Sequence, residues 1–446
     1  MSQTVPPILS VLPSRALVDK KFKVVVENLP PGSPVTLHSL LHSEENDFWE
    51  AFGHYISDHR GTVCVAEDLS FGGTYTGKEP MGLLWSMRPV PGSRKGLRHF
   101  SGINPKRGTK VSQGKVNPKK TRKLVQKNAA TVNPHVATMK PDLENHVSSS
   151  HWFNSGTRPL GVNPPSDHFN NLFLLASGPG PFPGLLDMWG GGGGLVEYRS
   201  ALLASRGYVS FALEYFAPCE QRSADVELNL FETAFCILKD HPQVIPEKIG
   251  LLGLSLGSTV TMYLAAESTV IKPRCCVCVS GSHGYRRGGP LRGVFELLLK
   301  NSHMMHVDEN NYQIWRDMGL GLTSDLSKKV DVGKINCPML LVNSEDDHVW
   351  ATVECAEDIA QMMQAAGKEH LLTRVQYPNT GHLIEPPYSP HVRASNFIIH
   401  YTKQKVIMLW GGQTKPHSDA QEDAWRKILS FLQHNLYCSP TLKAKM

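Results

Sequence analysis

The chain has 446 residues and 41% of them are hydrophobic, which is enough for two or three domains around a sizeable core. No hydrophobic run is long enough to cross a membrane and the N-terminal residues lack a secretion signal, so we expect no integral membrane association. Residues 106–127 hold nine Lys and Arg residues and no acidic residue, so the net charge of +6 does not describe the whole molecule. The nine cysteines form no paired framework, which is typical of a reducing compartment.

The first part of the chain, residues 6–93, is predicted to be an immunoglobulin-like β-sandwich domain. Short runs rich in β-branched and apolar residues mark its strands, and residues 30–34, which hold three prolines and a glycine, separate the second strand from the third. The predicted strands are residues 8–12, 22–26, 35–40, 49–56 and 62–65.

Residues 94–170 have a different composition, with few large apolar side chains and many Pro, Gly, Asn, Ser and Lys residues. We expect this basic segment to be irregular or disordered. Its basic run at 119–123 is a candidate nuclear-localisation or nucleic-acid patch, but no aromatic residues interleave with it. We therefore predict no nucleic-acid partner.

Residues 171–436 alternate between strand-like and helical patterns, which predicts a mostly parallel, doubly wound sheet covered on both faces. The expected strands are 172–176, 208–213, 249–254, 275–279, 339–343 and 372–377, the last of which precedes a closing helix at 421–432. Cys275, Cys276 and Cys278 have the spacing of a metal cluster. Because they lie in an apolar run, we interpret them as small buried side chains of a strand.

The sequence around Ser255 has the pattern of a nucleophile elbow. The run Gly253-Leu254-Ser255-Leu256-Gly257 follows an apolar strand and precedes a helical stretch, so the serine is expected on a sharp turn. At the start of the new helix, the Leu256 backbone amide would face a developing oxyanion. The alternative is a helix N-cap serine in an ordinary turn.

A serine nucleophile needs a base and an acid that orients the base. His382 follows the strand that ends at residue 377 and stands next to a glycine, which suits a general base on a loop. Asp347 is the preferred acid, Asp346 is the close alternative, and His348 is expected to have no proton-transfer role.

A second oxyanion donor is expected from the loop after the first strand of this domain, residues 178–184. The glycine tract 190–194 lacks the context of a phosphate-binding loop, and we predict that it allows close chain packing near the site. The chemistry requires no metal and no cofactor.

Several motifs closely resemble the type I acyl-CoA thioesterase and bile acid-CoA:amino acid N-acyltransferase family. They are residues 79–85, 178–188, 197–199, 346–348, 380–388 and 409–412. The resemblance covers about 8–90 and 172–435, whereas residues 94–170 do not look like the family's remaining β-domain strands. Leu256 also stands where lysine or glutamine is expected in relatives.

This resemblance implies an α/β-hydrolase domain preceded by an immunoglobulin-like domain. It implies that Ser255, Asp347 and His382 act as nucleophile, acid and base in the hydrolysis of a fatty acyl-CoA thioester, with coenzyme A released from the substrate. The relatives that conjugate acyl groups to glycine or taurine use a cysteine, so Ser255 favours water as the acceptor. Three alternatives remain. The chain is an N-acyltransferase that conjugates acyl groups to glycine or taurine, a catalytically inactive family member, or a carboxylesterase of the same fold.

The tail, residues 437–446, ends in Ala444-Lys445-Met446, which resembles the small, basic, apolar tripeptide read by the peroxisomal import receptor. We therefore expect a peroxisomal location, with the cytosol as the alternative, and the import receptor as a partner besides the acyl-CoA substrate.

Overall fold

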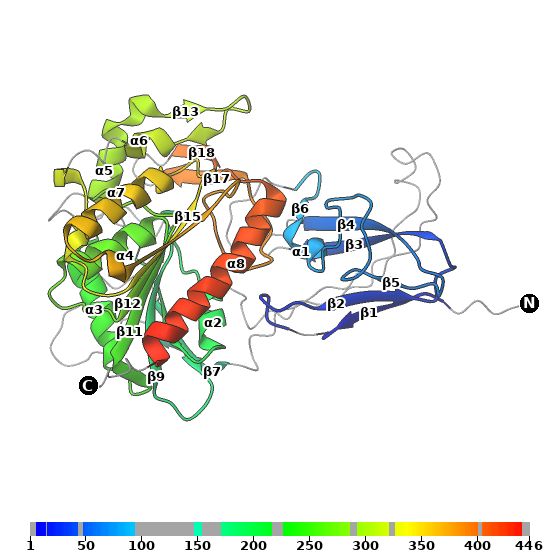
Figure 1. Ribbon diagram of the computed structural model, residues 1–446, viewed down its shortest axis with the longest axis horizontal. Coiled ribbons are helices and arrows are strands. Elements are labelled where there is room, and N and C mark those ends of the chain that lie inside the picture. Colours follow the sequence, from blue (N-terminus) through cyan, green and yellow to red (C-terminus); the bar gives the residue numbers. More distant parts are fainter. Residues whose placement is uncertain are drawn as a thin grey trace, which may run out of the picture. The chain divides into compact units, whose positions relative to one another are not determined.

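The computed structural model describes residues 6–14, 16–42, 48–93, 147–153, 171–215, 226–285, 292–320, 326–399 and 404–438. These residues form two compact units (Figure 1). The first contains the described residues before 94 together with Pro387–His391, and the second contains the described residues of 147–386 and of 392 onward.

The N-terminal unit contains two antiparallel sheets of three strands each, with strand orders β1-β2-β5 and β3-β4-β6. Alternate side chains of each sheet point into one core, where Val24 and Val26 of the first sheet join Leu37 and Tyr55 of the second. This arrangement confirms the predicted β-sandwich. Its elements are β1 (Ile8–Leu12), β2 (Lys23–Glu27), β3 (Pro34–His42), β4 (Phe48–Ile56), β5 (Val63–Cys64), α1 (Gly82–Trp85) and β6 (Arg88–Pro89).

Of residues 94–170, the structure describes only 147–153, and these form a strand, β7 (Val147–Phe153). It pairs antiparallel with β8 (Asn171–Ala176) at the end of the main sheet. The prediction of an irregular segment is therefore wrong for these residues. The remainder of that segment, including its basic run, lies outside the described residues.

The second unit is built on an eight-stranded sheet in the order β16-β15-β12-β11-β9-β10-β8-β7. All neighbouring pairs from β10 to β16 are parallel, whereas β8 runs antiparallel to both β10 and β7. Besides β7 and β8, the strands are β9 (Phe182–Met188), β10 (Val209–Leu213), β11 (Val244–Leu254), β12 (Cys275–Val279), β15 (Met339–Ser344) and β16 (Leu372–Tyr377).

Helices cover both faces of this sheet (Figure 1). Along β8, Phe173 and Leu175 join the core that contains Leu238 of one helix, while Leu172 and Leu174 pack on another. This alternation with a period of two is the pattern of a strand buried on both sides. Together with the strand order it confirms the α/β-hydrolase fold. The helices are α2 (Tyr198–Ala204), α3 (Leu228–Lys239), α4 (Leu256–Glu267), α5 (Arg292–Lys300), α6 (Arg316–Leu320), α7 (Thr352–Ala365) and α8 (Thr414–Leu432).

The cysteine-rich run forms β12, and all five of its residues are buried, so the prediction of a strand is confirmed. The Cys276 and Cys337 sulfur atoms lie 3.6 Å apart as free thiols. Burial raises the pKa of the Cys278 thiol to about 12, which makes it unreactive.

Two parts of the second unit differ from the prediction. Residues 182–184, expected in a loop, belong to β9, and β16 is not the last strand. A second, four-stranded sheet has the order β13-β14-β18-β17. Two of its strands precede β16 in the sequence and two come after it. These strands are β13 (His306–Val307), β14 (Gln313–Ile314), β17 (Ala394–Ile399) and β18 (Gln404–Leu409). Within the described ranges, no helix is both long and apolar enough to span a membrane.

Candidate functional site

Ser255 lies on the turn between β11 and α4, at the carboxyl end of the central strand. Its φ of 56° lies in the left-handed region, which a residue with a side chain occupies only at a cost in backbone strain. The turn leaves the serine at the N-terminus of α4, where helix amides point outward. This geometry is that of a nucleophile elbow.

The two flanking glycines are required by the closeness of the chain. A Cβ at Gly253 would lie 2.1 Å from the Gly257 carbonyl oxygen, and one at Gly257 would lie 2.3 Å from the Met188 carbonyl oxygen. Both distances are far below van der Waals contact, so any larger residue would push the strand and the helix apart. The spacing that identified Ser255 in the sequence is therefore a packing requirement.

His382 lies on the loop after β16 and is directed at the serine. Its Nε2 atom is 2.9 Å from Ser255 Oγ and its Nδ1 atom is 2.7 Å from Asp347 Oδ2. Asp347 and His382 are almost fully buried, and the serine is 9% exposed. With Nδ1 protonated toward the carboxylate, Nε2 is free to accept the serine proton. The structure thus brings the three predicted side chains together.

Backbone amides fix the Asp347 carboxylate. Its Oδ1 atom accepts hydrogen bonds from the amides of Val349 and Trp350, at 2.8 and 2.9 Å. The second oxygen, Oδ2, is left to face the imidazole, with Ser344 Oγ 3.5 Å away. Because the turn itself holds one oxygen, the other has little freedom to leave the histidine.

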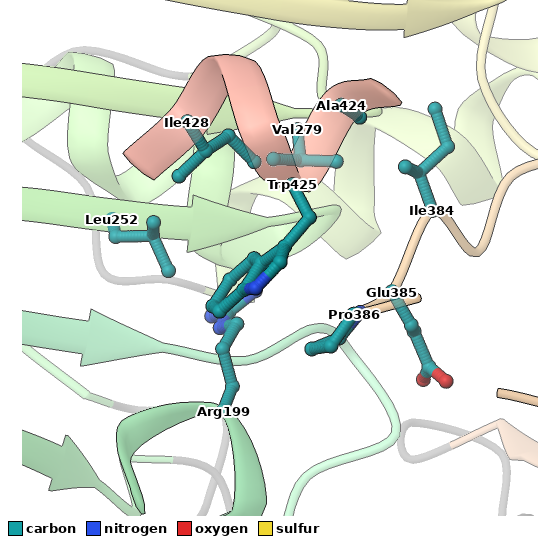
Figure 2. A pocket seen from close by; sticks show the side chains of 9 residues that line it. All are labelled: Arg199, Leu252, Val279, Ile384, Glu385, Pro386, Ala424, Trp425 and Ile428. Atoms are coloured by element: carbon teal, nitrogen blue, oxygen red, sulfur yellow. The ribbon is translucent and has the colours of Figure 1, made fainter. Parts of the chain in front are cut away.

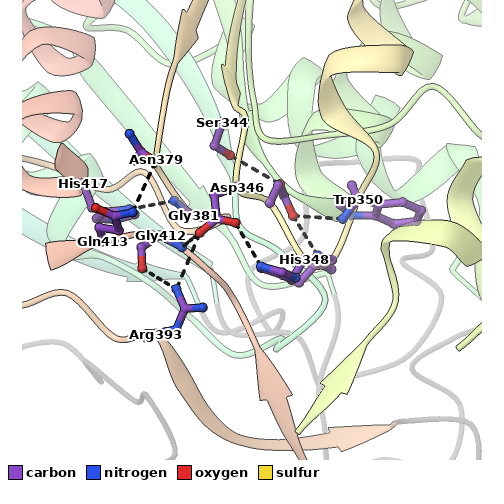
Figure 3. Close-up of polar contacts among 12 residues, drawn as sticks. Ser344, Asp346, His348, Trp350, Asn379, Gly381, Arg393, Gly412, Gln413 and His417 are labelled. Carbon is purple, nitrogen blue, oxygen red and sulfur yellow. Dashed lines mark hydrogen bonds and ion pairs between the residues drawn. The ribbon is translucent and has the colours of Figure 1, made fainter. Parts of the chain in front are cut away.

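Asp346 contacts a different set of residues. Its carboxylate accepts a hydrogen bond from the Gly412 amide at 2.7 Å and lies 3.0 Å from His348 Nε2 (Figure 3). Arg393 lies 3.5 Å from the same carboxylate. These contacts tie Asp346 to the segment after β18, whereas Asp347 is the carboxylate that contacts the imidazole.

The loop that carries His382 is held on both sides. The Gly381 amide donates to His417 Nδ1 at 3.1 Å, and His417 Nε2 lies 2.9 Å from the Leu383 carbonyl oxygen (Figure 3 shows the first of these contacts). The His382 amide itself donates to the Trp410 carbonyl at 2.8 Å, and the Trp410 ring stacks on the imidazole. Sequence reasoning missed His417, which lies on α8, 35 residues beyond the histidine that it supports.

Two backbone amides next to Ser255 are candidates for an oxyanion hole. Leu256 and Gly190 are both buried, and within the described part of the chain neither amide donates a hydrogen bond. A Cβ at Gly190 would lie 3.0 Å from Ser255 Cβ and 3.5 Å from Ser255 Oγ, so its backbone passes directly beside this serine. Buried amides rarely lack partners, and an incoming oxyanion would supply one. The glycine tract therefore packs closely near the site, as predicted.

The expected position of the second donor, residues 178–184, is wrong. Phe182 pairs with Val244 at the start of β11, whereas Ser255 follows the end of that strand. Residues 178–184 therefore lie at the opposite edge of the sheet. The loop at the carboxyl edge is the one after β9, which begins at Trp189.

A small pocket lies on the side of the sheet covered by α2 and α8 (Figure 2). Apolar side chains from β11, β12 and α8 form most of its wall, and Figure 2 shows the Arg199 side chain extending toward Trp425. Its lining residues are Arg199, Leu252, Val279, Ile384, Glu385, Pro386, Ala424, Trp425 and Ile428. Because Ser255, Asp347 and His382 are not among them, this pocket is separate from the serine site.

No group of three or more His, Cys, Asp or Glu side chains within the described ranges could hold a metal ion. The cluster at Ser255 instead has the groups needed for nucleophilic attack and proton transfer: a hydroxyl, an imidazole, a carboxylate and two amides. Such a set can transfer an acyl group from an ester or a thioester.

Comparison with known families gives two matches. The family model described as "BAAT / Acyl-CoA thioester hydrolase C terminal" matches residues 226–438. The model described as "Acyl-CoA thioester hydrolase/BAAT N-terminal region" matches residues 19–132. The second match includes residues 94–132, which corrects the expectation that the resemblance stops before them.

Curated relatives align over nearly the whole chain. A Mus musculus protein named "Peroxisomal succinyl-coenzyme A thioesterase" is 31% identical, with 96% of each chain covered. "Acyl-coenzyme A thioesterase 1" from Mus musculus is 30% identical, again with 96% of each chain covered. The "Bile acid-CoA:amino acid N-acyltransferase" of Mus musculus is 29% identical over 96% of this chain and 97% of its own length. The chain thus belongs to the acyl-CoA thioester hydrolase and bile acid-CoA:amino acid N-acyltransferase family.

Proposed function

We propose that this protein hydrolyses fatty acyl-CoA thioesters to free fatty acids and coenzyme A, with Ser255 as the nucleophile. The observation that carries the proposal is the chain of short contacts from Asp347 through His382 to Ser255 Oγ, at 2.7 and 2.9 Å. Membership of the acyl-CoA thioester hydrolase family supports a thioester as the bond that is broken.

In the first half of the reaction, His382 Nε2 takes the hydroxyl proton while Ser255 Oγ attacks the thioester carbonyl. The buried Asp347 carboxylate stabilises the imidazolium that forms. The amides of Leu256 and Gly190 hold the oxyanion, and each such donor contributes about 3–4 kcal/mol to transition-state stabilisation. The carbon–sulfur bond then breaks, and His382 returns its proton to the departing coenzyme A thiolate.

In the second half, water replaces the thiol. His382 takes a proton from the water as its oxygen attacks the acyl carbonyl, and the same two amides hold the second oxyanion. Collapse of this intermediate breaks the bond to Ser255 Oγ, which regains its proton from the imidazolium. The fatty acid leaves and the free enzyme is restored.

An apolar surface next to the nucleophile supports a fatty acyl group. The Cβ position of Gly191 lies 3.9 Å from Leu256 Cδ2 and 3.9 Å from the nearest ring atom of Phe295. With leucine at the position after the nucleophile, no charged side chain is available there to pair with an acyl group that ends in a carboxylate. We therefore expect a long-chain substrate to be preferred over succinyl-CoA.

The alternative reaction transfers the acyl group to glycine or taurine, as the name of one relative indicates. Both reactions share the acyl-enzyme and differ only in the nucleophile that attacks it. An amine acceptor would require a binding site close to His382 and would be detected as an N-acyl conjugate.

The test is release of free coenzyme A thiol from palmitoyl-CoA and from succinyl-CoA by the full chain, with and without glycine or taurine. We expect turnover of palmitoyl-CoA that the amino acids do not change. Ser255→Ala should reduce kcat by about 10⁶-fold, the loss expected when a nucleophile is removed. The matched control is Ser258→Ala, which removes a buried serine hydroxyl from α4 that makes none of the contacts joining Ser255, His382 and Asp347. Equal activity of Ser255→Ala and the control would contradict the serine mechanism.

The proposal includes a peroxisomal location, because one relative bears that location in its name. Microscopy of the full chain with an N-terminal fluorescent tag tests it. Signal that coincides with peroxisomes and becomes diffuse when residues 444–446 are removed would support recognition by the import receptor. Diffuse signal from both chains would favour the cytosol.

A further inference from the structure

We propose that Tyr215 is a positioning residue that sets the direction of the second oxyanion donor, the Gly190 amide. This inference rests on the proposed function, because it assigns a role within the same site. It concerns the end of β9 and the loop after it, where three successive residues, Met188, Trp189 and Gly190, pass beside the turn that carries Ser255.

The argument starts from the geometry of a peptide plane. In a trans peptide the carbonyl and the amide of the next residue point in opposite directions. A group that holds the Trp189 carbonyl therefore also fixes the direction of the Gly190 amide. The Tyr215 hydroxyl donates a hydrogen bond to this carbonyl.

Tyr215 is suited to hold this carbonyl firmly. It follows β10 and its side chain is 2% exposed, with the ring packed against Phe231 of α3 at a centroid distance of 5.3 Å. Burial raises the pKa of Tyr215 far above its usual range, so the hydroxyl remains protonated and able to donate at neutral pH. A buried aromatic ring has few rotamers available, which keeps the hydroxyl in place.

Arg199 holds the preceding peptide in the same way. Its Nη2 atom donates to the Met188 carbonyl at 3.1 Å, and its guanidinium lies over the Trp189 ring at 5.3 Å. Buried Asp187 fixes the guanidinium through Nε at 2.9 Å and through Nη2. The Asp187 carboxylate in turn accepts a hydrogen bond from Ser200 Oγ at 2.7 Å.

Backbone packing closes the carbonyl side of the loop. The position of a Cβ on Gly257 would be 2.3 Å from the Met188 oxygen and 2.6 Å from the Trp189 oxygen, so both carbonyls press against the first turn of α4. Together with this packing, the hydrogen bonds from Tyr215 and Arg199 hold both carbonyls in place. Donors held rigidly need not reorganise as the oxyanion forms, which is the basis of their effect on rate.

The experiment compares Tyr215→Phe with Tyr437→Phe in the full chain. Tyr437 is the matched control because its hydroxyl also donates to a backbone carbonyl, that of Gly207, before the start of β10 and so at the edge opposite Ser255. For each variant we would measure kcat and KM with palmitoyl-CoA, and the inhibition constant of a long-chain alkyl trifluoromethyl ketone. This ketone adds to the serine and places an alkoxide in the oxyanion hole.

For Tyr215→Phe we expect kcat to fall about tenfold with KM within twofold of wild type, and the ketone to bind about tenfold more weakly. If Tyr215 only stabilised the fold, its loss would not reduce kcat and ketone affinity by the same factor at constant KM. Tyr437→Phe should change none of the three values by more than twofold. All assays are run at least 20 °C below the midpoint of thermal unfolding of each variant.

Arg199→Lys provides a second variant, because it keeps the charge beside Asp187 but lacks the fork that reaches the Met188 carbonyl. The same signature of reduced kcat and ketone affinity, at constant KM, is expected. Unchanged kcat in both variants, or reduced kcat with unchanged ketone affinity, would overturn the inference. Wild-type protein without Ser255-dependent turnover would instead contradict the proposed function, so the two failures are distinguishable.

Discussion

Two histidine–carboxylate pairs lie at the carboxyl edge of the same parallel sheet. His382 follows β16 and is bonded to Asp347, whereas His283 follows β12 and its Nε2 lies 2.5 Å from Asp358 of α7. Both imidazoles are about 1% exposed. Both histidines follow a strand of the sheet within a few residues.

The pairs differ in what surrounds them. His382 directs its second nitrogen at a hydroxyl, while His283 Nδ1 has no hydrogen-bond partner among the described residues. Asp358 also accepts a hydrogen bond from Lys329 at 2.6 Å, whereas among the described residues Asp347 contacts neutral groups and the imidazole. Partial burial raises the pKa of Asp358, yet the bonds from His283 and Lys329 hold it below its usual value.

This comparison indicates which surroundings allow the histidine of such a pair to act as a general base. A carboxylate already neutralised by a lysine gains little from an imidazolium beside it, and an imidazole without a nucleophile has no proton to take. We therefore interpret the contact between His283 and Asp358 as a structural link between the loop after β12 and α7.

The largest expected difference is between Asp347→Asn and Asp358→Asn. Asp347→Asn should lower kcat for palmitoyl-CoA by about 10⁴-fold, because the amide no longer orients the imidazole in its reactive tautomer. Asp358→Asn should leave kcat within about twofold and lower the midpoint of thermal unfolding. Steady-state kinetics and calorimetry of the two variants, side by side, make the test.

Equal losses of kcat in the two variants would show that the β12 loop takes part in the reaction, against this interpretation. Asp317→Asn is a suitable surface control, because its carboxylate is 35% exposed and lies outside both pairs. It should leave both measurements unchanged.

A smaller effect is expected for the neighbouring acid, Asp346. Asp346→Ala removes the acceptor of the Gly412 amide and the contact with His348, and so loosens the segment whose Trp410 carbonyl binds the His382 amide. We expect kcat to fall about tenfold and stability to fall by about 1–2 kcal/mol, the cost of an unpaired amide. Urea unfolding and initial rates measure the two effects. A loss of kcat as large as that of Asp347→Asn would mean that the two acids had been assigned the wrong roles.

The sequence predicted the residues that depend on local backbone chemistry. Ser255 was identified by glycines that the turn requires, and His382 by its place after a strand. The contact between Asp347 and the imidazole has a reason that is only partly local. The nearby amides of Val349 and Trp350 hold the Asp347 carboxylate, whereas Gly412, far along the chain, holds that of Asp346.

Contacts between distant segments explain what the sequence could not predict. The loop expected to hold the second oxyanion donor was misplaced because the three prolines and three glycines of residues 178–184 are typical of a loop, although residues 182–184 form the first part of β9. Tertiary pairing of Phe182 with Val244 overrides that local preference. Likewise, nothing near Tyr215 in the sequence indicates the carbonyl to which its hydroxyl donates.

The smallest predicted effect is a change in the pH dependence of stability, and it isolates His283. Burial lowers the pKa of His283 below its usual 6.5, with the Asp358 carboxylate opposing the shift and Lys329 adding to it. Below pH 6.5 the unfolded chain therefore takes up a proton that the folded chain resists, so the free energy of unfolding decreases as pH falls. His283→Gln removes this contribution. The drop in unfolding midpoint between pH 7.5 and pH 5.5 should be smaller in His283→Gln than in wild type, whereas an unchanged slope would show that His283 is not held neutral. The contact between His283 and Asp358 is separate from Ser255. In His283→Gln, kcat at pH 7.5 should therefore stay within twofold of wild type, whereas any substitution of His382 should lower it.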